Sequence, residues 1–119
     1  MVTLFVTNFL LEHFNCTNIM TNENIGIYKI TNNVTSKVYI GQSERLDERF
    51  GEHLSKLEAG NHTNKSFQDD CINMDKDLLE YTLSFEILTK CAKEDLNEYE
   101  RFHILDHITN LGKDLVYNY

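Results

Sequence analysis

The chain has 119 residues, which leaves room for one domain with one modest hydrophobic core. It carries 11 Lys and Arg against 19 Asp and Glu, a net charge of -8, and so lacks the basic excess with which most nucleic-acid-binding domains neutralise phosphates. The three cysteines, Cys16, Cys71 and Cys91, show no CxxC spacing, which argues against a zinc finger and indicates a reducing, intracellular setting.

Residues 1–24 differ from the rest of the chain because they contain no Lys or Arg. Their apolar stretches are broken by Thr7 and Asn8, so they are too short and too polar to span a membrane. No positively charged start marks a signal peptide. We expect an N-terminal extension, either a helix that packs on the domain or a stretch upstream of a true start at Met20, followed by one domain over residues 25–119.

A β-hairpin is predicted over residues 26–41. The stretches GIYKIT (26–31) and KVYIG (37–41) are rich in β-branched and aromatic residues, and the polar stretch 32–36 between them holds turn-forming residues. The two strands are therefore expected to pair antiparallel.

The register of this hairpin follows from the position of its turn. If the turn is centred on residues 33–34, Tyr28 lies opposite Tyr39 and Ile27 lies opposite Ile40. Because side chains alternate along a strand, both tyrosines share one face of the sheet and both isoleucines share the other. A three-residue loop with a bulge would change this register. A cross-strand tyrosine pair commonly does no more than stabilise a sheet.

Residues 44–59 are predicted to form a helix, with Ser43 as its N-cap and Gly60 as its end. Three stripes run along it: an apolar face of Leu46, Phe50, Leu54 and Leu57, an acidic row of Glu44, Glu48 and Glu52, and a basic row of Arg45, Arg49, His53 and Lys56. Adjacent acidic and basic rows usually form a salt-bridged surface. Directly after a hairpin with paired tyrosines, however, Arg49 and His53 indicate a phosphate site.

The rest of the chain predicts three further elements: a weaker helix over residues 65–74, a strand over residues 81–88 and a long amphipathic helix over residues 93–108. The element order is then β-β-α-α-β-α. We expect an α+β fold in which a small three-stranded antiparallel sheet is flanked by helices.

The order of these motifs resembles the GIY-YIG endonuclease domain. The GIY of residues 26–28, the YIG of residues 39–41 and the Arg49–His53 pair on the next helix have the spacing of that family. The resemblance extends over residues 25–119 and includes His62, as in phage-type homing members, Glu100 in the helix after the third strand and Asn118 in a terminal Tyr-Asn pair. It implies the same fold as the pattern of elements does.

The resemblance implies catalytic roles for Tyr28, Tyr39, Arg49, His53, Glu100 and Asn118. Tyr28 would be the general base, and because a free phenol has a pKa of about 10, a cation would have to lower it for action near neutrality. Tyr39 would orient water or phosphate, and Arg49 would stabilise charge on the phosphate. His53 would donate to the phosphate or relay protons to Tyr28, unless it is only a surface histidine.

Glu100 would be the single protein ligand of a divalent cation, Mg²⁺ or another such as Mn²⁺. Asn118 would hold Glu100 or a phosphate, with fraying of the chain end as the competing expectation. His103 stands where the family usually has an aromatic residue, and with His107 it offers an alternative zinc or iron site. We favour a buried or stacked His103, and expect no small-molecule cofactor.

The implied function is a metal-dependent DNA endonuclease that resembles homing or mobile-element members. The net charge predicts low intrinsic affinity for DNA, so the chain is either a fragment that lacks a separate DNA-binding module or partner, or one that meets DNA transiently. Two alternatives remain open: a DNA-repair or structure-specific nuclease, and a non-catalytic remnant that binds nucleic acid or protein. An intracellular location, in a host cell if the chain is viral, and no membrane contact are expected. The candidate DNA contacts are Lys37, Arg45, Lys56, His62 and Lys65.

Overall fold

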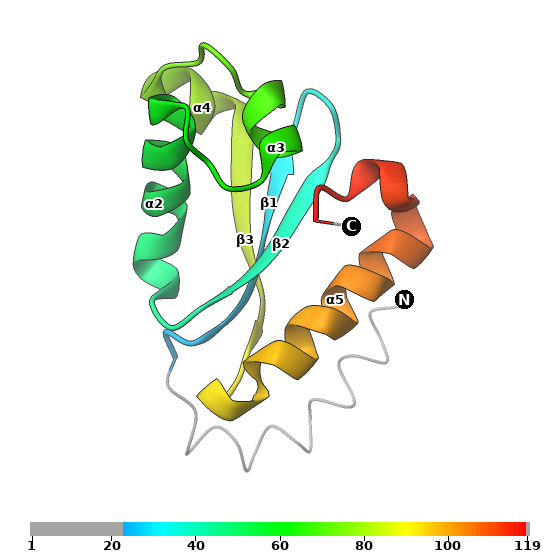
Figure 1. The fold of residues 1–119 in the computed structure, drawn as a ribbon. Helices are drawn as coiled ribbons and strands as arrows, with labels where there is room; N and C mark the ends of the chain where they lie inside the picture. Colours follow the sequence, from blue (N-terminus) through cyan, green and yellow to red (C-terminus); the bar gives the residue numbers. More distant parts are fainter. Residues whose placement is uncertain (1–22, 119) are drawn as a thin grey trace.

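A three-stranded antiparallel sheet lies at the centre of the molecule, with helices on both of its faces (Figure 1). The computed structural model describes residues 23–118, so what the sequence predicts for residues 1–22 lies outside the described part of the chain. The strands are β1 (Gly26–Asn32), β2 (Val38–Ser43) and β3 (Leu83–Lys90); the helices are α2 (Leu46–Ala59), α3 (Lys65–Asp70), α4 (Lys76–Thr82) and α5 (Leu96–Leu111), with short 3-10 turns at Lys93–Asp95 and Lys113–Leu115.

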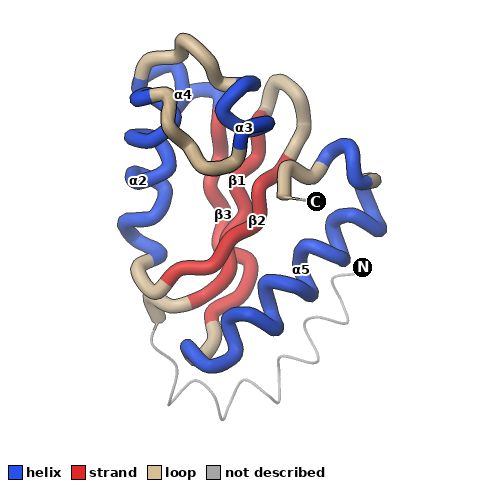
Figure 2. The backbone as a smooth tube through the Cα atoms, in the orientation of Figure 1, coloured by secondary structure: helices blue, strands red, loops and turns tan. Residues whose placement is uncertain are grey.

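Each face of the sheet carries its own apolar core. Helices α2, α3 and α4 cover one face, where Tyr28 and Ile30 are fully buried, and α5 covers the other, where Ile27 and Ile40 are fully buried (Figure 2). The strand order is β2-β1-β3, so β1 is the middle strand and is covered on both faces. This arrangement confirms the predicted α+β class and the predicted sheet. None of the helices in residues 23–118 has the length and apolar character that a membrane span requires.

The hairpin pairs in a register two residues away from the predicted one. Tyr28 lies opposite Gly41, and Tyr39 lies opposite Ile30. The loop is longer than expected because the Asn32 side chain accepts hydrogen bonds from the backbone of the following residues and Ser36 adopts a positive φ of 70°. A shift of two residues preserves the faces, so the prediction that the two tyrosines share one face is confirmed.

Helix α2 begins at Leu46 and ends before Gly60, whose φ of 80° confirms it as the predicted end. Ser43 is not its side-chain cap, as the sequence had suggested. Asn24, which precedes β1, accepts a hydrogen bond from the backbone N–H of Asp47 through its side chain. The start of α2 is therefore held by a residue just before β1, the strand that carries Tyr28.

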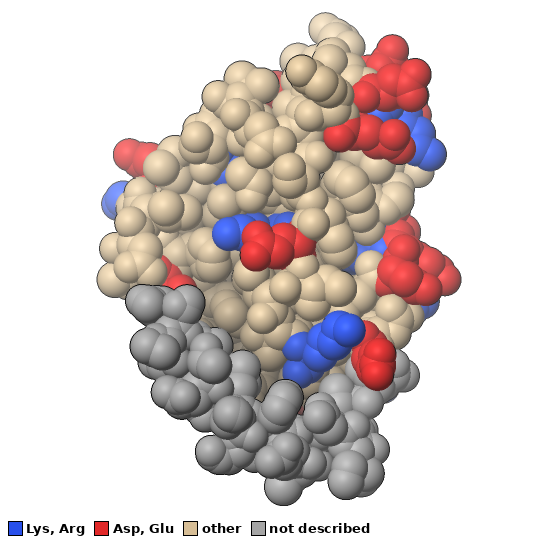
Figure 3. All heavy atoms as spheres, turned by 180° about the vertical axis from the view of Figure 1, so that it is seen from behind, with Lys and Arg blue, Asp and Glu red and all other residues tan. Residues whose placement is uncertain are grey.

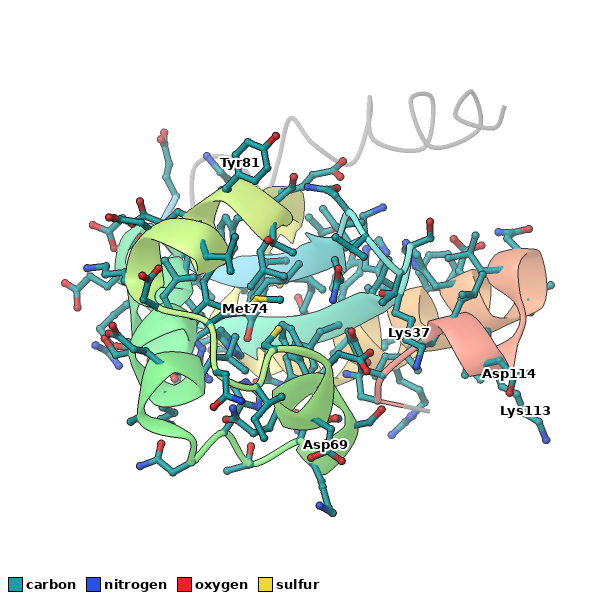
Figure 4. All side chains as sticks on the ribbon, turned by 90° about the horizontal axis from the view of Figure 1, so that it is seen from above. Lys37, Asp69, Met74, Tyr81, Lys113 and Asp114 are labelled. Atoms are coloured by element: carbon teal, nitrogen blue, oxygen red, sulfur yellow. The ribbon has the colours of Figure 1, made fainter. Side chains whose placement is uncertain are left out.

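The helix predicted over residues 65–74 is wrong in extent. α3 ends at Asp70, Asn73 takes a left-handed φ of 66°, and Asp75 caps a new helix, α4, by accepting from the N–H of Leu78. The observed order is thus β-β-α-α-α-β-α, and β3 begins only at Leu83. Tyr81, predicted as a strand residue, lies at the end of α4 and points into solvent, whereas Met74 points toward the core (Figure 4).

The end of the chain lies along β2. Helix α5 starts three residues later than predicted, after a 3-10 turn, and ends before Gly112. Val116 then pairs with Val38 in an isolated parallel bridge, and the N–H of Tyr117 donates to the carbonyl of Val38. The outer edge of β2, beside the loop that Tyr39 follows, is therefore partly covered by the last described residues.

Candidate active site

Tyr28 occupies the centre of the sheet face beneath α2. Its ring stacks on Phe85 with centroids 5.2 Å apart, and the Tyr39 ring lies 6.5 Å away. Gly41, directly opposite, leaves the space for the phenol, because a Cβ atom at this position would lie 2.3 Å from the Tyr28 hydroxyl oxygen. The glycine of the YIG motif is thus needed to make room for the tyrosine of the GIY motif.

We expect Gly41→Ala to expel the Tyr28 ring from its place and to lower the free energy of unfolding by about 1–3 kcal/mol, the usual cost of overpacking a core. Urea denaturation measures this change. Gly51→Ala is the matched control, because a Cβ atom at Gly51 meets nothing within 4 Å and alanine favours a helix. A Gly41→Ala protein as stable as the wild type would show that the phenol is not confined there.

A chain of hydrogen bonds runs from Tyr28 through two buried histidines. The Tyr28 hydroxyl oxygen lies 2.6 Å from Nε2 of His53, and Nδ1 of His53 lies 2.7 Å from Nε2 of His62. The backbone N–H of Asn64 donates to Nδ1 of His62 at 3.0 Å. His62 is buried and both of its ring nitrogens are engaged, although it lines the smaller pocket beside Arg49. Its contact with DNA stays a prediction.

The direction of this chain follows from its last member. A backbone N–H can only donate, so neutral His62 accepts at Nδ1 and carries its proton on Nε2. His53 then accepts at Nδ1, and its own proton, on Nε2, points at the Tyr28 oxygen. His53 is 6 % exposed, so the alternative that it is a surface histidine is wrong.

Arg49 provides a second donor to the same oxygen, with its Nε 3.4 Å from the Tyr28 hydroxyl. Two donors favour the ionised phenolate over the phenol. Burial has the larger effect, however, and raises the pKa of Tyr28 to about 12 against the lowering effect of Arg49. The expected depression of this pKa is absent from the structure, and the phenol is neutral at pH 7.

Burial also keeps His53 neutral. It lowers the pKa of His53 to about 3, and the positive charge of Arg49 acts in the same direction. The pKa of His62 is lowered as well, first by burial and then by the charge of Lys56. At neutral pH both imidazoles are therefore uncharged: His62 donates to His53, and His53 donates to the Tyr28 oxygen.

Glu100 reaches the same region from α5. Nε2 of Gln42, on β2, donates to Oε1 of Glu100 at 2.6 Å and to Oδ1 of Asn97 at 2.8 Å. The charge of Glu100 adds to burial in raising the pKa of both Tyr28 and Tyr39. The two proton-bearing phenols and the carboxylate are thus electrostatically coupled across the sheet.

An open cleft of about 560 Å³ lies between the start of α2 and the start of α5. A smaller pocket of about 50 Å³ lies next to it, against Tyr39, His53 and His62, and Arg49 lines both. The residues that line the larger cleft are Gln42, Ser43, Glu44, Arg45, Arg49 and Leu96. A ligand in the cleft could contact both Arg45 and Arg49, and Gln42, which also lines the cleft, donates to the Glu100 carboxylate.

The alternative metal site at Glu100, His103 and His107 is wrong. Within residues 23–118, no group of three or more His, Cys, Asp and Glu side chains is placed to hold a metal ion. Nε2 of His103 shares a hydrogen bond with the Thr89 hydroxyl at 2.7 Å, and Nδ1 of His107 donates to the His103 carbonyl. His103 is half-buried and makes an edge contact with the Phe102 ring, whereas a buried or stacked residue was expected. A lone, oriented carboxylate suits a hard cation that keeps waters and binds substrate oxygens.

Asn118 does not bond to Glu100. Its side-chain oxygen accepts from the N–H of Ile40 at 3.2 Å, and its amide nitrogen donates to the Ile40 carbonyl. The expectation that this residue frays is wrong, and the predicted contact with Glu100 is replaced by one with the edge of β2. Asn118 therefore secures the strand segment that carries Tyr39 and Gly41.

The remaining candidate cations lie in different settings. Lys37 pairs with Asp70 at 3.5 Å, and Lys65 pairs with Asp69 on α3. Lys56 lines the smaller pocket, and Arg45 lines the larger cleft. The structure thus brings Arg45, Lys56 and Arg49 to the site, and does not bring Lys37 or Lys65 there through any described contact.

Sequence reasoning missed the contributions of Gln42 and Asn64. Gln42 is one polar residue on a short strand, and only the approach of α5 shows that its amide reaches Glu100. Asn64 acts through its backbone N–H, which no residue type records. The presence of Gly41 in the YIG motif was the one feature of the sequence that could have indicated the space for the Tyr28 ring.

This fold and site define a catalytic domain of the GIY-YIG nuclease class, and comparison with known proteins agrees. A sequence model of the GIY-YIG catalytic domain matches residues 24–107, so the chain belongs to this family. Among solved structures, the catalytic domain of homing endonuclease I-TevI is similar at 26% identity with a TM-score of 0.62, over 78% of this chain and 95% of that one.

A mutant of the catalytic domain of intron endonuclease I-TevI also matches, at 26% identity with a TM-score of 0.58, over 69% of this chain and 81% of that one. No curated protein matches at the same level of significance.

Proposed function

We propose that this chain is a DNA endonuclease of the homing type that hydrolyses phosphodiester bonds with the help of a divalent cation, Mg²⁺ or Mn²⁺. The observation that carries the proposal is the convergence of two donors, from His53 and Arg49, on the hydroxyl oxygen of Tyr28. Arg49 lines the larger cleft together with Gln42, and the Gln42 amide donates to the carboxylate of Glu100. The likeness to the I-TevI catalytic domain supports the same reaction class.

In the proposed reaction, ionised Tyr28 removes a proton from a water molecule whose oxygen attacks the phosphorus. The new bond to phosphorus forms as the bond to the leaving sugar oxygen breaks, and that oxygen takes a proton from solvent. The His53 proton on Nε2 and the Arg49 Nε–H stabilise negative charge on the Tyr28 oxygen. The other nitrogens of the guanidinium contact the phosphate oxygens as their charge increases.

Glu100 would hold the cation, with Gln42 fixing one carboxylate oxygen. A cation bound there would stabilise the leaving oxygen and lower the pKa of nearby groups. Tyr28 needs such help, because burial keeps its phenol protonated in the structure described here. The site therefore suits a catalyst that becomes competent only with metal and DNA in place.

Weak DNA binding is part of the proposal. Net charge is -8, and on the face of the described residues seen in Figure 3 basic and acidic side chains lie next to one another without a continuous basic surface. A polyanion would gain few counterion-release contacts there. We therefore propose that a separate DNA-binding module or partner raises the affinity for DNA in the cell.

Incubation with supercoiled plasmid, with Mg²⁺ and with chelator, tests the function. We expect nicking or linearisation only with the metal. Arg49→Ala should slow cleavage by about 10²- to 10³-fold, the effect of removing a donor that acts on developing charge. Arg45→Ala is the matched control on the same helix, and should mainly weaken DNA binding and flatten its salt dependence. Equal, small effects from both would contradict the assigned roles.

A further inference from the structure

One carboxylate on α2 bridges the two arginines of the cleft. Oε1 of Glu52 lies 2.8 Å from Nη1 of Arg49, and Oε2 of Glu52 lies 2.8 Å from Nη1 of Arg45. Each carboxylate oxygen is thus bound by a different guanidinium. The two arginines that line the cleft are therefore paired with the same side chain of the protein.

The geometry of this bridge is that of a phosphate site. A phosphodiester also presents two non-bridging oxygens that share one negative charge, and guanidinium groups bind carboxylate and phosphate oxygens in the same way. We propose that Glu52 stands in the place of a DNA backbone phosphate, so that Arg45 and Arg49 form one phosphate site which the chain's own carboxylate fills until DNA displaces it. This inference rests on the proposed DNA substrate.

The contacts of Arg49 allow such an exchange without loss of the catalytic arrangement. Arg49 binds Glu52 through Nη1 but faces the Tyr28 hydroxyl through Nε. A phosphate oxygen can therefore replace Glu52 at Nη1 while Nε stays against the Tyr28 oxygen. The phosphate would then lie within reach of the group proposed to activate the attacking water.

Fold stability gives little reason for the bridge. The side chains are 55%, 34% and 31% exposed for Arg45, Arg49 and Glu52, and ion pairs at such exposure contribute little to stability. Arg45 also has a second acidic partner, Glu48, at 3.0 Å. The bridge would instead affect which anions bind. A single small anion gains little free energy by displacing the Glu52 carboxylate, whereas a polyanion that makes several further contacts can displace it.

The test compares Glu52→Gln with Glu48→Gln. Both variants remove one negative charge from α2, but within residues 23–118 Glu48 forms an ion pair with Arg45 alone whereas Glu52 pairs with both arginines. Affinity for a short DNA duplex is measured by fluorescence anisotropy in chelator, so that no cleavage occurs. We expect Glu52→Gln to bind about five- to tenfold more tightly than the wild type and Glu48→Gln less than about twofold.

The gain should shrink when Arg45 is already alanine, because one of the two guanidiniums that Glu52 holds is then missing. Cleavage by Glu52→Gln at low DNA concentration should rise in parallel with affinity. Equal gains in affinity for both Gln variants would overturn the inference, because Glu52 would then act only through its general negative charge. A fall in cleavage at unchanged affinity would also overturn it, because Glu52 would then serve to position Arg49. Failure of the wild type to cut plasmid would refute the proposed function separately, since the affinities measured in chelator do not depend on it.

Discussion

Replacement of Glu100 by glutamine is expected to slow DNA cleavage by more than about a hundredfold, because the amide keeps the size of the side chain but removes the charge that would hold the cation. DNA affinity in chelator should stay the same or increase, since one acidic charge is lost beside the cleft. Cleavage at increasing Mg²⁺ and direct Mn²⁺ binding by electron paramagnetic resonance measure the two effects.

Glu98→Gln is the matched control for this prediction. Glu98 is an exposed acid on the same helix and should be replaceable without effect on either measurement. Normal metal binding by Glu100→Gln would show that the cation is held elsewhere. A loss of cleavage at unchanged metal binding would instead make Glu100 a group that acts on substrate or water.

Tyr28→Phe should abolish cleavage and leave the fold nearly intact, because only a hydroxyl that accepts hydrogen bonds is removed. The active form of a base is the deprotonated one, and the pKa of Tyr28 is about 12. Below that pKa the phenolate fraction increases about tenfold per pH unit, so the wild-type rate should climb with pH through the neutral and alkaline range. A bound cation would move the plateau to lower pH.

The pH dependence of the rate also tests the protonation of His53, which contacts the Tyr28 hydroxyl. The pKa of His53 is about 3, so no inflection from this group is expected near pH 6.5. Tyr81→Phe provides the control, since this tyrosine is exposed at the end of α4. A rate that does not depend on pH, or cleavage that survives Tyr28→Phe, would assign the role of base to another group.

The elements and faces of this domain could be predicted from its sequence where local patterns decide them. Alternation along the GIY and YIG strands placed both tyrosines on one face, and the apolar stripe of the following helix predicted the buried positions Leu46, Leu54 and Leu57. The exact strand pairing could not be predicted, because it depends on hydrogen bonds that the Asn32 side chain makes within its own loop.

The site was predictable as a set of residues and not as an arrangement. The motif spacing identified Tyr28, Arg49 and His53, which the structure brings together. It did not show that His62 lies beneath the surface, because the burial of a histidine after a helix depends on how the next helix returns to the sheet. The division of residues 65–82 into two helices was missed for a similar reason: a left-handed Asn73 interrupts a stretch with acceptable helix propensity.

The backbone N–H of Asn64 fixes the direction of the hydrogen bonds from His62 through His53 to Tyr28, and a change of the side chain at position 64 does not reverse it. Every amino acid except proline supplies the same main-chain donor at position 64, so this position is free to vary as far as the histidines are concerned. The imidazoles at positions 53 and 62 have no such freedom, because each must accept on one nitrogen and donate from the other. Substitution of either histidine should therefore break the line of hydrogen bonds, whereas substitution of Asn64 should act through its other contacts: its side chain caps α3 by accepting from the N–H of Phe67 and donates to the Tyr117 carbonyl.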